Sequence, residues 1–485
     1  MTVTILDCYT DEPAGLGVPP YLGTYPRYVF GKIVEETGEL PTYLTIDDLR
    51  AHIFYQDKFH EKKTTDIRVY NLTKNYPKIQ QILDGTTELI IILGVHVPGK
   101  YLSALPGTLH EVISLVKHLK CRKVLTGPAI IGTSLEGGKT YEKADLSHFD
   151  EIRPFQFPFP KVASYSLLGA RIVEQIPDYR IVEIESGRGC TSKGCNFCTE
   201  PIKSRLMFRK REDIVRETEA LFAAGVRDVR LGKQSCFYDL PSPDKLVEEI
   251  NHDFKWRTFH IDNVIPNNVL TPRGIKTTEA IVKYCTPGNI AAFGVESFDP
   301  AVVEANQLNC SPEDAYRAVA EVNRLGKELG GNGMPKYLSG INVIFGLEGE
   351  SKATHEHNMR WLRKILDDGL LVRRINVRQV VVFEGTRLQE RAGLKYLKKN
   401  KKYYWKWRDE IRHKVDLPML GNLVPKGHIL RNVRTEIYDG NTTFGRQIGS
   451  YPLVVGVKGH LPLKEFVDIR VTGHMLRSVT GEVFK

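Results

Sequence analysis

The sequence predicts an α/β protein with three folded parts: an N-terminal Rossmann-like domain, a central partial (βα)6 barrel and a small C-terminal β-barrel. Three observations lead to this prediction. A chain of 485 residues is too long for one ordinary domain. Through most of the chain, apolar runs of strand length alternate with helical patterns. The end of the chain instead contains only short strand-like runs separated by glycines.

The first part covers residues 1–175. Strands are predicted at residues 2–6, 89–95 and 123–126, with a helix at 109–120. This order favours a parallel sheet with crossover helices. Residues 11–28, rich in Gly, Pro and Tyr, are predicted as a shaped loop. That loop is either a plain connector or the lip of a ligand crevice at the carboxyl edge of the sheet.

The second part covers residues 176–390 and repeats strand and helix in turn. Strands are predicted at 181–185, 226–231, 256–262, 290–295, 339–345 and 375–383, and helices at 211–224, 277–285, 313–329 and 355–366. Repeats of this kind predict a parallel barrel, partial or complete, and place functional residues at the carboxyl ends of its strands.

Residues 391–430 are predicted as a basic, aromatic linker, and residues 431–485 as a barrel of the size of an OB fold. The linker interleaves lysines with aromatic rings that could stack on bases. The residues expected to bind RNA are Lys402, Tyr404, Trp405, Lys406 and Trp407.

The composition favours a cytoplasmic protein without a membrane span. The longest apolar run, Leu89–Val95, is far too short to cross a bilayer, and the first residues read as a strand and not as a signal peptide. Lys and Arg exceed Asp and Glu by 68 to 58, which gives a net charge of +10 and makes an anionic partner plausible.

Three of the eight cysteines crowd into one loop, at positions 190, 195 and 198. In a reducing compartment such crowding favours metal or cluster ligation over disulfides. Three thiolates cannot complete a tetrahedral zinc site, which needs four protein ligands. An iron–sulfur cluster accepts three thiolates and leaves one iron open. The alternatives are zinc completed by a distant cysteine and chance crowding.

The stretch Glu185–Pro201 resembles the signature of the radical S-adenosylmethionine (SAM) superfamily, C-x3-C-x-aromatic-C. One residue is added between Cys190 and Cys195, and the aromatic Phe197 is retained. The resemblance implies a [4Fe-4S] cluster on Cys190, Cys195 and Cys198 whose open iron binds SAM. It also implies an electron donor of flavodoxin or ferredoxin type, and a 5′-deoxyadenosyl radical that abstracts a hydrogen atom.

The resemblance continues over the barrel and is strongest to methylthiotransferases and their cobalamin-dependent relatives. It rests on the segments Val229–Tyr238, Phe293–Val303, Ile341–Ser351 and Phe383–Leu388. By this resemblance the residues that would bind SAM are Phe197, Gln234, Glu296, Ser297, Val343 and Gly346. The C-terminal part resembles a TRAM domain, with which many methylthiotransferases hold tRNA.

Two interpretations of the N-terminal part remain open. Methylthiotransferases keep an auxiliary cluster there on three cysteines, but only Cys8 and Cys121 precede the cysteine loop. The other interpretation is a cobalamin-binding domain, because residues 17–23 and 93–134 resemble parts of that domain. The usual D-x-H-x-x-G motif is absent, and His96 is expected to be a plain loop residue.

Together these features predict a radical SAM enzyme that methylates or methylthiolates a nucleoside in tRNA. A second hypothesis is a cobalamin-dependent methyltransferase that acts on a small molecule, lipid or protein. A third, from another class, is a non-catalytic RNA-binding protein with a structural metal.

Overall fold

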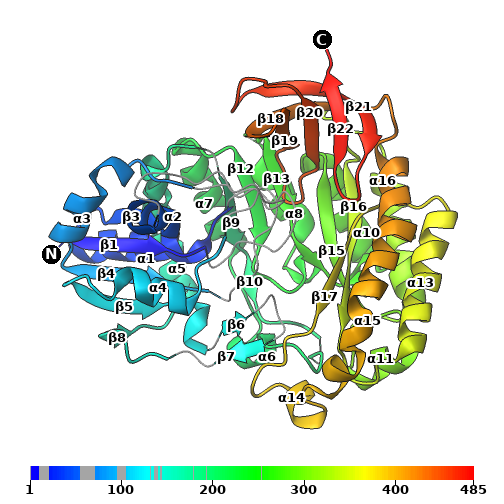
Figure 1. Cartoon of the computed structure of the whole chain (residues 1–485), viewed down its shortest axis with the longest axis horizontal. Coiled ribbons are helices and arrows are strands. Elements are labelled where there is room, and N and C mark those ends of the chain that lie inside the picture. Colours follow the sequence, from blue (N-terminus) through cyan, green and yellow to red (C-terminus); the bar gives the residue numbers. More distant parts are fainter. Residues whose placement is uncertain are drawn as a thin grey trace. The chain divides into compact units, whose positions relative to one another are not determined.

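The computed structural model describes residues 2–9, 21–54, 71–94, 105–131, 133–135, 140–142, 145–178, 180–192, 194–252 and 254–485 (Figure 1). The chain forms two compact units. The first contains residues 1–184 and 209–229, and the second contains residues 185–208 and 230–485. The chain passes from one unit to the other three times: within strand β9 (Ile181–Glu185), after Phe208 and within strand β12 (Asp228–Gly232).

The first unit is built on a five-stranded parallel sheet in the order β3-β1-β4-β5-β8. Numbered along the chain, this is the order 2-1-3-4-5 of flavodoxin-like doubly wound folds. The strands of this unit, inside and outside that sheet, are β1 (Val3–Asp7), β2 (Tyr21–Leu22), β3 (Thr42–Thr45), β4 (Glu88–Ile92), β5 (Arg122–Thr126), β6 (Thr133–Leu135), β7 (Thr140–Glu142) and β8 (Glu151–Ile152). Its helices are α1 (Thr24–Thr37), α2 (Ile46–Leu49), α3 (Ile79–Gly85), α4 (Leu109–Val116), α5 (Phe159–Gly169) and α7 (Arg211–Ala223). The predicted Rossmann-like parallel sheet is therefore confirmed.

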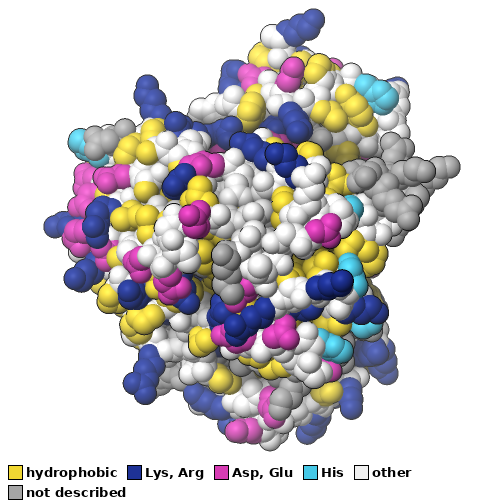
Figure 2. All heavy atoms as spheres, turned by 90° about the vertical axis from the view of Figure 1, so that its left-hand side faces the viewer, with side chains coloured by type: hydrophobic (Ala, Val, Ile, Leu, Met, Phe, Trp, Pro, Cys, Tyr) yellow, Lys and Arg dark blue, Asp and Glu magenta, His cyan; other side chains and the backbone are white. Residues whose placement is uncertain are grey.

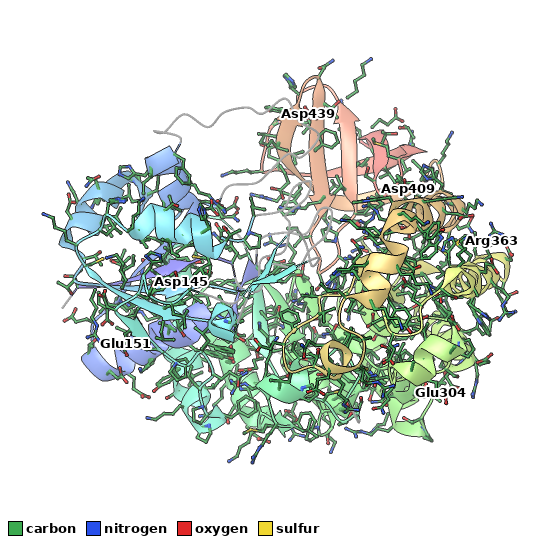
Figure 3. All side chains as sticks on the ribbon, turned by 60° about the horizontal axis from the view of Figure 1, so that its bottom comes forward. Asp145, Glu151, Glu304, Arg363, Asp409 and Asp439 are labelled. Carbon is green, nitrogen blue, oxygen red and sulfur yellow. The ribbon has the colours of Figure 1, made fainter. Side chains whose placement is uncertain are left out.

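Charged side chains mark the surface of this unit. On the face shown in Figure 2, Lys and Arg are interspersed with Asp and Glu and do not gather by sign. Glu151, labelled in Figure 3, lies on the edge strand β8 and pairs with Arg122 and Arg153, at 2.6 and 2.8 Å. Charges on an edge strand discourage pairing with another chain.

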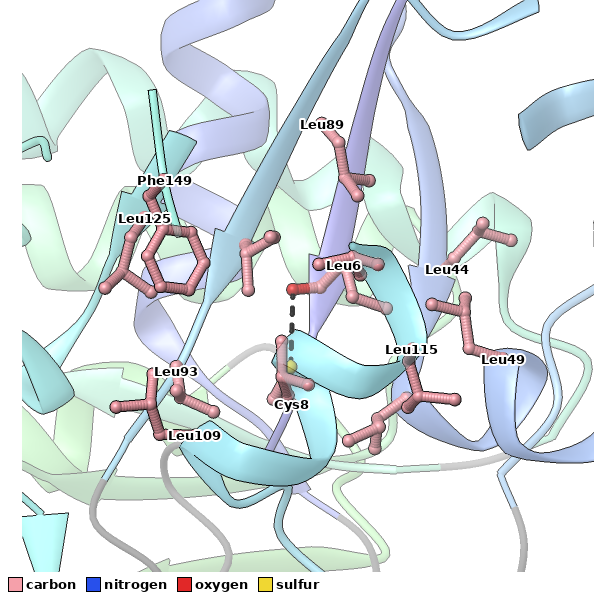
Figure 4. Close-up of a cluster of buried hydrophobic side chains, with 14 of the residues drawn as sticks. Leu6, Cys8, Leu44, Leu49, Leu89, Leu93, Leu109, Leu115, Leu125 and Phe149 are labelled. Carbon is pink, nitrogen blue, oxygen red and sulfur yellow. Dashed lines mark hydrogen bonds between the residues drawn. The ribbon is translucent and has the colours of Figure 1, made fainter. Parts of the chain in front are cut away.

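The core of the first unit lies between the sheet and its helices. Leu6, Leu89 and Leu125 of the strands pack against Leu109 and Leu115 of α4 (Figure 4). Cys8 belongs to this core, and its thiol lies 4.0 Å from the carbonyl oxygen of Leu6. A buried thiol directly after β1 is a packing residue and is not available as a cluster ligand.

The second unit contains the parallel sheet β14-β15-β16-β17. The strands of this unit that precede α15, inside and outside that sheet, are β10 (Gly187–Arg188), β11 (Met207–Phe208), β13 (Thr258–Ile261), β14 (Asn263–Val264), β15 (Asn289–Glu296), β16 (Tyr337–Phe345) and β17 (Val372–Gln379). Its helices are α6 (Glu200–Lys203), α8 (Pro243–His252), α9 (Pro266–Val269), α10 (Pro272–Tyr284), α11 (Pro300–Ala305), α12 (Pro312–Gly326), α13 (Lys352–Asp367) and α14 (Arg387–Arg391). The predicted strands and helices are present, with ends that differ by a few residues as helix and strand ends commonly do.

The segment predicted as a linker is instead helical. It forms α15 (Lys395–Ile411), a π-helical turn (Arg412–Asp416) and α16 (Leu417–Leu423). The sequence analysis did not predict this helix, whose aromatic residues bury one face: Tyr404, Trp407 and Ile411 are interior residues. An amphipathic helix of this kind packs on the domain and does not span two domains.

The chain ends in a closed barrel, β18-β19-β20-β22-β21, as the sequence predicted. Its strands are β18 (Ile429–Asp439), β19 (Thr442–Gln447), β20 (Val454–Lys458), β21 (Phe466–His474) and β22 (Val479–Val483). β22 closes the barrel by pairing in parallel with β20 and antiparallel with β21. The barrel core also includes Ile290 and Leu338, from the beginnings of β15 and β16.

In the described part of the chain, no helix has the length and apolarity that crossing a bilayer requires.

Candidate functional site

The loop that carries Cys190, Cys195 and Cys198 follows β10 and ends at α6. Gly189 at its start has φ +77°, and a Cβ atom there would lie 2.6 Å from the backbone of Leu206. Only glycine fits this conformation and close approach. Glu200 holds the loop closed, since its Oε1 accepts a hydrogen bond of 2.9 Å from the N–H of Gly189.

The environment of the three thiols suits ligands that lose their protons to a metal. All three cysteines are free and partly buried. The N–H groups of Ser192 and Glu200 donate to the sulfur atoms of Cys190 and Cys198, each at 3.4 Å. Burial raises the pKa of Cys195 to about 12, and the neighbouring negative charges of Cys198, Glu296 and Cys190 add to this effect. Burial also raises the pKa of Cys198. A bound iron offsets this cost because it stabilises the thiolate form.

The donor set fits an iron–sulfur cluster. Within the described residues, no group of three His, Cys, Asp or Glu side chains converges closely enough to hold one metal ion. In a four-iron cluster each cysteine binds its own iron, so three thiolates need not meet at one point. Cys190, Cys195 and Cys198 would hold the cluster, which leaves one iron without a protein ligand.

Asn196, between two of the cysteines, anchors the loop to the rest of the second unit. Its N–H donates to the carbonyl oxygen of Asn306 at 3.0 Å, and its Nδ2 donates to that of Ala305 at 2.6 Å. Its own carbonyl accepts from the N–H of Leu388 at 2.9 Å. Asn306 in turn donates to the carbonyl of Glu348 at 2.8 Å. These amides connect the cysteine loop to the segment that follows β16.

Gln234 and Glu296 follow or end strands of the predicted barrel. The Oε1 of Gln234 accepts a 2.9 Å hydrogen bond from the hydroxyl of Ser186, and the N–H of Ser186 donates to the carbonyl of Gly232. Glu296 ends β15 at a β-bulge and has φ +62°, an uncommon value for a residue with a side chain. Its Oε2 is buried and has no hydrogen-bond partner among the described residues.

The burial and the unpaired oxygen of Glu296 indicate that its side chain binds a polar ligand. Burial raises the pKa of Glu296 to about 8, and Arg378 of β17 only partly offsets this. A buried oxygen without a partner costs free energy that a bound hydroxyl or amine would recover. Backbone strain and an unpaired polar atom at one residue are typical of functional sites.

The remaining residues predicted to bind SAM differ in their burial, packing and hydrogen bonding. Ser297 is buried and its hydroxyl accepts from the N–H of Asp299 at 3.1 Å, so it caps a turn. Val343 is fully buried within β16. Phe197 packs beside Leu347 and Val380 in a small apolar cluster. Gly346 directly follows β16 with φ +97°. Of these, Phe197 and Gly346 lie where the cysteine loop and the end of β16 meet.

Sequence patterns did not single out the residues that fix the end of β16. The carboxylate of Glu350 accepts hydrogen bonds from the N–H of Gly346 at 2.6 Å and from the Nδ2 of Asn400 at 2.8 Å. Burial raises the pKa of Glu350 to about 7. Glu350 was visible only as part of a motif, and Asn400 of α15 gave no sequence signal because its partner lies 50 residues away.

The residues predicted to bind RNA divide into buried and exposed groups. Tyr404 and Trp407 are 8% and 5% exposed and pack edge-on or tilted against Phe345. Their rings therefore cannot stack on bases, which corrects the prediction for these two residues. Lys402 and Lys406 are exposed, and Trp405 is 53% exposed. The exposed group forms the outer face of α15.

Beside α15 lies a groove of about 820 Å³, shared with α13. Arg363, labelled in Figure 3, and Lys406 line it together with Asp367, Asp368 and Glu410. Because acidic and basic residues alternate along it, the groove does not present one sign of charge.

Two predicted features lie outside the described residues. His96 is one, and most of the glycine- and proline-rich loop is the other, of which Tyr21–Leu22 forms β2 and Thr24 begins α1.

Comparisons with known proteins agree with the chemistry of the cysteine loop. Residues 184–362 match the model of the Radical SAM superfamily. An uncharacterized protein of Methanocaldococcus jannaschii, MJ0274, is 38% identical over 99% of this chain and 93% of its own length. An uncharacterized protein of Archaeoglobus fulgidus is 36% identical over 99% of this chain and 90% of its own length.

Among solved structures, the chain is similar to TsrM, a radical SAM methyltransferase from Kitasatospora setae with cobalamin and a [4Fe-4S] cluster bound. The TM-score is 0.47 at 12% identity, over 78% of this chain and 72% of that chain. It is also similar to OxsB, a cobalamin-dependent SAM radical enzyme, with a TM-score of 0.48 at 12% identity, over 84% of this chain and 56% of that chain. At such TM-scores the likeness is too distant to carry substrate or residue roles.

Proposed function

Because the chain belongs to the same family as the two archaeal relatives and carries a radical SAM domain, we propose that it functionalises a C–H bond of a nucleoside in tRNA, by methylation or methylthiolation. The single observation that carries the radical chemistry is the loop of Cys190, Cys195 and Cys198 within the matched domain. When bound, the cluster and SAM supply a 5′-deoxyadenosyl radical that abstracts a hydrogen atom.

The protein's own residues would bind and orient these groups. The three thiolates hold the cluster, and Asn196 keeps their loop in place. Gln234, the unpaired carboxylate of Glu296 and the backbone near Val343 and Gly346 offer polar contacts for SAM. A flavodoxin- or ferredoxin-type protein would supply the electron.

Release of 5′-deoxyadenosine tests this chemistry. Anaerobically reconstituted protein with dithionite and SAM should release it, and the Cys198→Ala variant should not. Cys285→Ala is the matched control, because Cys285 directly follows α10 and its thiol interacts with Asn289 at the beginning of β15. No release from wild type, or equal release from Cys198→Ala, would refute the proposal.

The choice of RNA rests on charge and on the outer face of α15. The net charge is +10, and Lys402, Trp405 and Lys406 present two cations and an aromatic ring to solvent. Phosphate contacts release counterions, so affinity for tRNA should fall steeply with salt, and Lys402→Gln/Lys406→Gln should reduce the slope by about 2. A tRNA affinity that does not depend on salt would contradict an RNA substrate.

A second candidate is a cobalamin-dependent methyltransferase that acts on a small molecule, lipid or protein. The strand order 2-1-3-4-5 of the first unit favours it, because such sheets bind ligands at the carboxyl edge where the order reverses, here between β1 and β4. Visible spectra of the protein with added cobalamin distinguish the two candidates. A bound corrin supports the second, and an unchanged spectrum of free cobalamin supports the first.

A further inference from the structure

Four arginine side chains from three separate segments of the second unit gather near the beginning of β17. Arg373 and Arg374 belong to β17, Arg412 opens the π-helical turn, and Arg477 lies between β21 and β22. None of them belongs to a motif discussed above. Besides burial, the charge of Arg374 lowers the pKa of Arg373 and of Arg477, and the charge of Arg412 lowers the pKa of Arg374 and of Arg477, so the four side chains form one cluster.

The backbone of β17 brings the side chains of the consecutive residues Arg373 and Arg374 to the same neighbour, Tyr451. The register of β17 against β16 shifts between Ser339 and Gly340, which leaves Arg373 as an extra residue. A β-bulge of this kind turns neighbouring side chains toward one side of the sheet. Both arginines accordingly reach Tyr451: Arg373 donates to its carbonyl at 3.0 Å, and the Cζ of Arg374 lies 4.6 Å from its ring centroid.

The cluster contains too few negative charges. Arg412 pairs with Asp416 and donates to the carbonyl of Ile375 at 2.6 Å. Asp416 also accepts from the N–H of Ile375, at 3.2 Å. It is the one carboxylate, among the described residues, that acts on Arg373, Arg374 and Arg477 together. Four guanidinium groups against one carboxylate leave three positive charges unbalanced.

A second carboxylate, Asp262, contacts Tyr451 but is already shared with other cations. Asp262 accepts the Tyr451 hydroxyl at 3.0 Å and pairs with Arg230 at 3.7 Å. It also acts on Lys233, which follows β12. Its charge is therefore not available to the four arginines.

The cost of this arrangement appears in the arginines themselves. Burial, followed by repulsion from Arg412 and Arg374, holds the pKa of Arg477 well below the ordinary value for arginine. Burial and the charge of Arg374 lower the pKa of Arg373 to about 10. Arginine keeps its proton in proteins. The lowered pKa values therefore mean that burial and mutual repulsion of these charged side chains destabilise the folded protein. Arg412 is buried and the other three arginines are partly buried, and charges that lose contact with water are normally paired or bind a ligand of opposite charge.

We propose that Arg373, Arg374, Arg412 and Arg477 bind a phosphate group of the substrate, an inference that rests on the proposed function. A guanidinium fork matches phosphate oxygens. A carboxylate, like the phosphodiester of an RNA backbone, would balance one charge with two oxygens, whereas a phosphomonoester carries nearly two charges and three terminal oxygens. A phosphomonoester therefore balances more of the charge of this cluster than a phosphodiester does, and a phosphodiester binds with the same guanidinium fork.

The position of the cluster suits a nucleotide. Arg374, Asn376 and Arg378 alternate along β17 and so share one face. The guanidinium of Arg378 donates to the Asn376 amide oxygen once that amide is turned over, and, against the effect of burial, the charge of Arg378 lowers the pKa of Glu296. Arg374 and Arg378 are about 13 Å apart along the strand. A nucleotide whose phosphate lies at Arg374 would extend toward Glu296 and the carboxyl end of the sheet. The phosphate could belong to a free nucleotide or to the backbone of RNA.

Phosphate binding can be measured on the reconstituted full chain without dithionite or SAM. The probes are inorganic phosphate, a nucleoside 5′-monophosphate and a short RNA without terminal phosphates, each against KCl of equal ionic strength. We expect at least one of them to raise the Tm of wild type more than KCl does. Arg477→Gln should raise the Tm of the ligand-free protein, because repulsion is relieved, and should weaken phosphate affinity at least tenfold.

Two further variants sharpen the test. Arg374→Lys keeps the charge and loses the fork, and should also weaken phosphate affinity at least tenfold. Arg317→Gln removes an exposed arginine paired with Asp314 on α12 and should match wild type in both measurements.

The outcomes distinguish a free nucleotide from the RNA backbone as the source of the phosphate, and they distinguish failure of the phosphate site from failure of the proposed function. A response to the monophosphate identifies a free phosphomonoester, and a response to the RNA identifies its backbone. No response of wild type beyond KCl, an Arg477→Gln variant that binds phosphate as wild type does, or a lower Tm of ligand-free Arg477→Gln would overturn the proposal. Since no radical is formed in this experiment, absent release of 5′-deoxyadenosine would refute the proposed function alone.

Discussion

Glu350 shows how one buried side chain sets the geometry of the candidate site. It is 1% exposed and holds the N–H of Gly346, which has the left-handed conformation that ends β16. It also holds Asn400, so it joins this turn to α15. A Cβ atom on Gly346 would lie 2.7 Å from Leu397 of the same helix. The turn at Gly346, which was predicted to bind SAM, is thus fixed by a helix in the segment that was predicted as a linker.

The protonation of Glu350 gives a prediction for stability against pH. Its pKa is raised from 4.5 to about 7, so between these values the folded protein binds a proton that the unfolded chain has lost. This contribution, of up to about 3 kcal/mol, is present below pH 4.5 and is lost as pH rises through about 7. Glu350→Gln cannot ionise, so its free energy of unfolding relative to wild type should increase as pH rises over this range.

Urea unfolding at several pH values measures this difference. Glu304→Gln on α11 is the control, because Glu304 is exposed (Figure 3) and its replacement should leave the pH dependence as in wild type. A constant difference between Glu350→Gln and wild type from pH 5 to 8 would show that Glu350 does not titrate in this way.

At the scale of elements, one face of α15 packs against the rest of the second unit, and the opposite face is exposed and is the proposed RNA-binding surface. Trp407 stacks on His355 with ring centroids 5.3 Å apart and contacts Phe345, whereas Trp405 lies on the opposite, basic face. Trp407→Ala should therefore lower the free energy of unfolding by about 3–5 kcal/mol. Trp405→Ala should change it by less than about 0.5 kcal/mol and should weaken tRNA binding by about 1–3 kcal/mol.

Denaturant unfolding and a filter-binding titration with tRNA test the two variants together. The opposite pattern, a stable Trp407→Ala and a destabilised Trp405→Ala, would mean that α15 presents its other face. Equal tRNA affinity of Trp405→Ala and wild type would remove the aromatic ring from the proposed interface.

A buried ion pair joins the helices of the first unit. Arg27 of α1 is fully buried, pairs with Glu217 of α7 and donates to the carbonyl of Glu183 in β9. Arg209 pairs with the other oxygen of Glu217. Together the two arginines hold the pKa of Glu217 below its usual value against the effect of burial.

Arg27→Ala should cost about 3–5 kcal/mol, because it leaves buried polar groups without their partner. Lys32→Ala is the matched control on the same helix, since Lys32 pairs with Glu36 at the surface and should cost less than about 0.5 kcal/mol. Equal unfolding midpoints for the two variants would show that the buried pair contributes little to the first unit.

For the whole molecule, local patterns in the sequence were enough to predict most of the longer strands and to single out the cysteine loop. β9 is an uninterrupted buried run, and the thiols of the loop lie within nine residues of one another, so both signals are contiguous. The closed C-terminal barrel was also predicted, although its last strand has a weak signal in the sequence, because the run Val479–Val483 of β22 contains glycine and glutamate.

The features that could not be predicted depend on contacts between distant residues. Tyr404 and Trp407 look like stacking residues in a basic segment, and only the packed structure shows that they face Phe345. The arginine cluster combines residues 373 and 477, whose approach depends on the fold of the second unit. Likewise, residues 209–229 return to the first unit, which no local composition signals.

The central claim is that Cys190, Cys195 and Cys198 hold a cluster with one iron open to SAM. The most direct test is the electron paramagnetic resonance spectrum of the dithionite-reduced, reconstituted protein before and after SAM is added. We predict a four-iron cluster signal that shifts on addition of SAM, and no such signal from Cys195→Ser. A signal that SAM leaves unchanged, or one that persists in Cys195→Ser, would contradict the account.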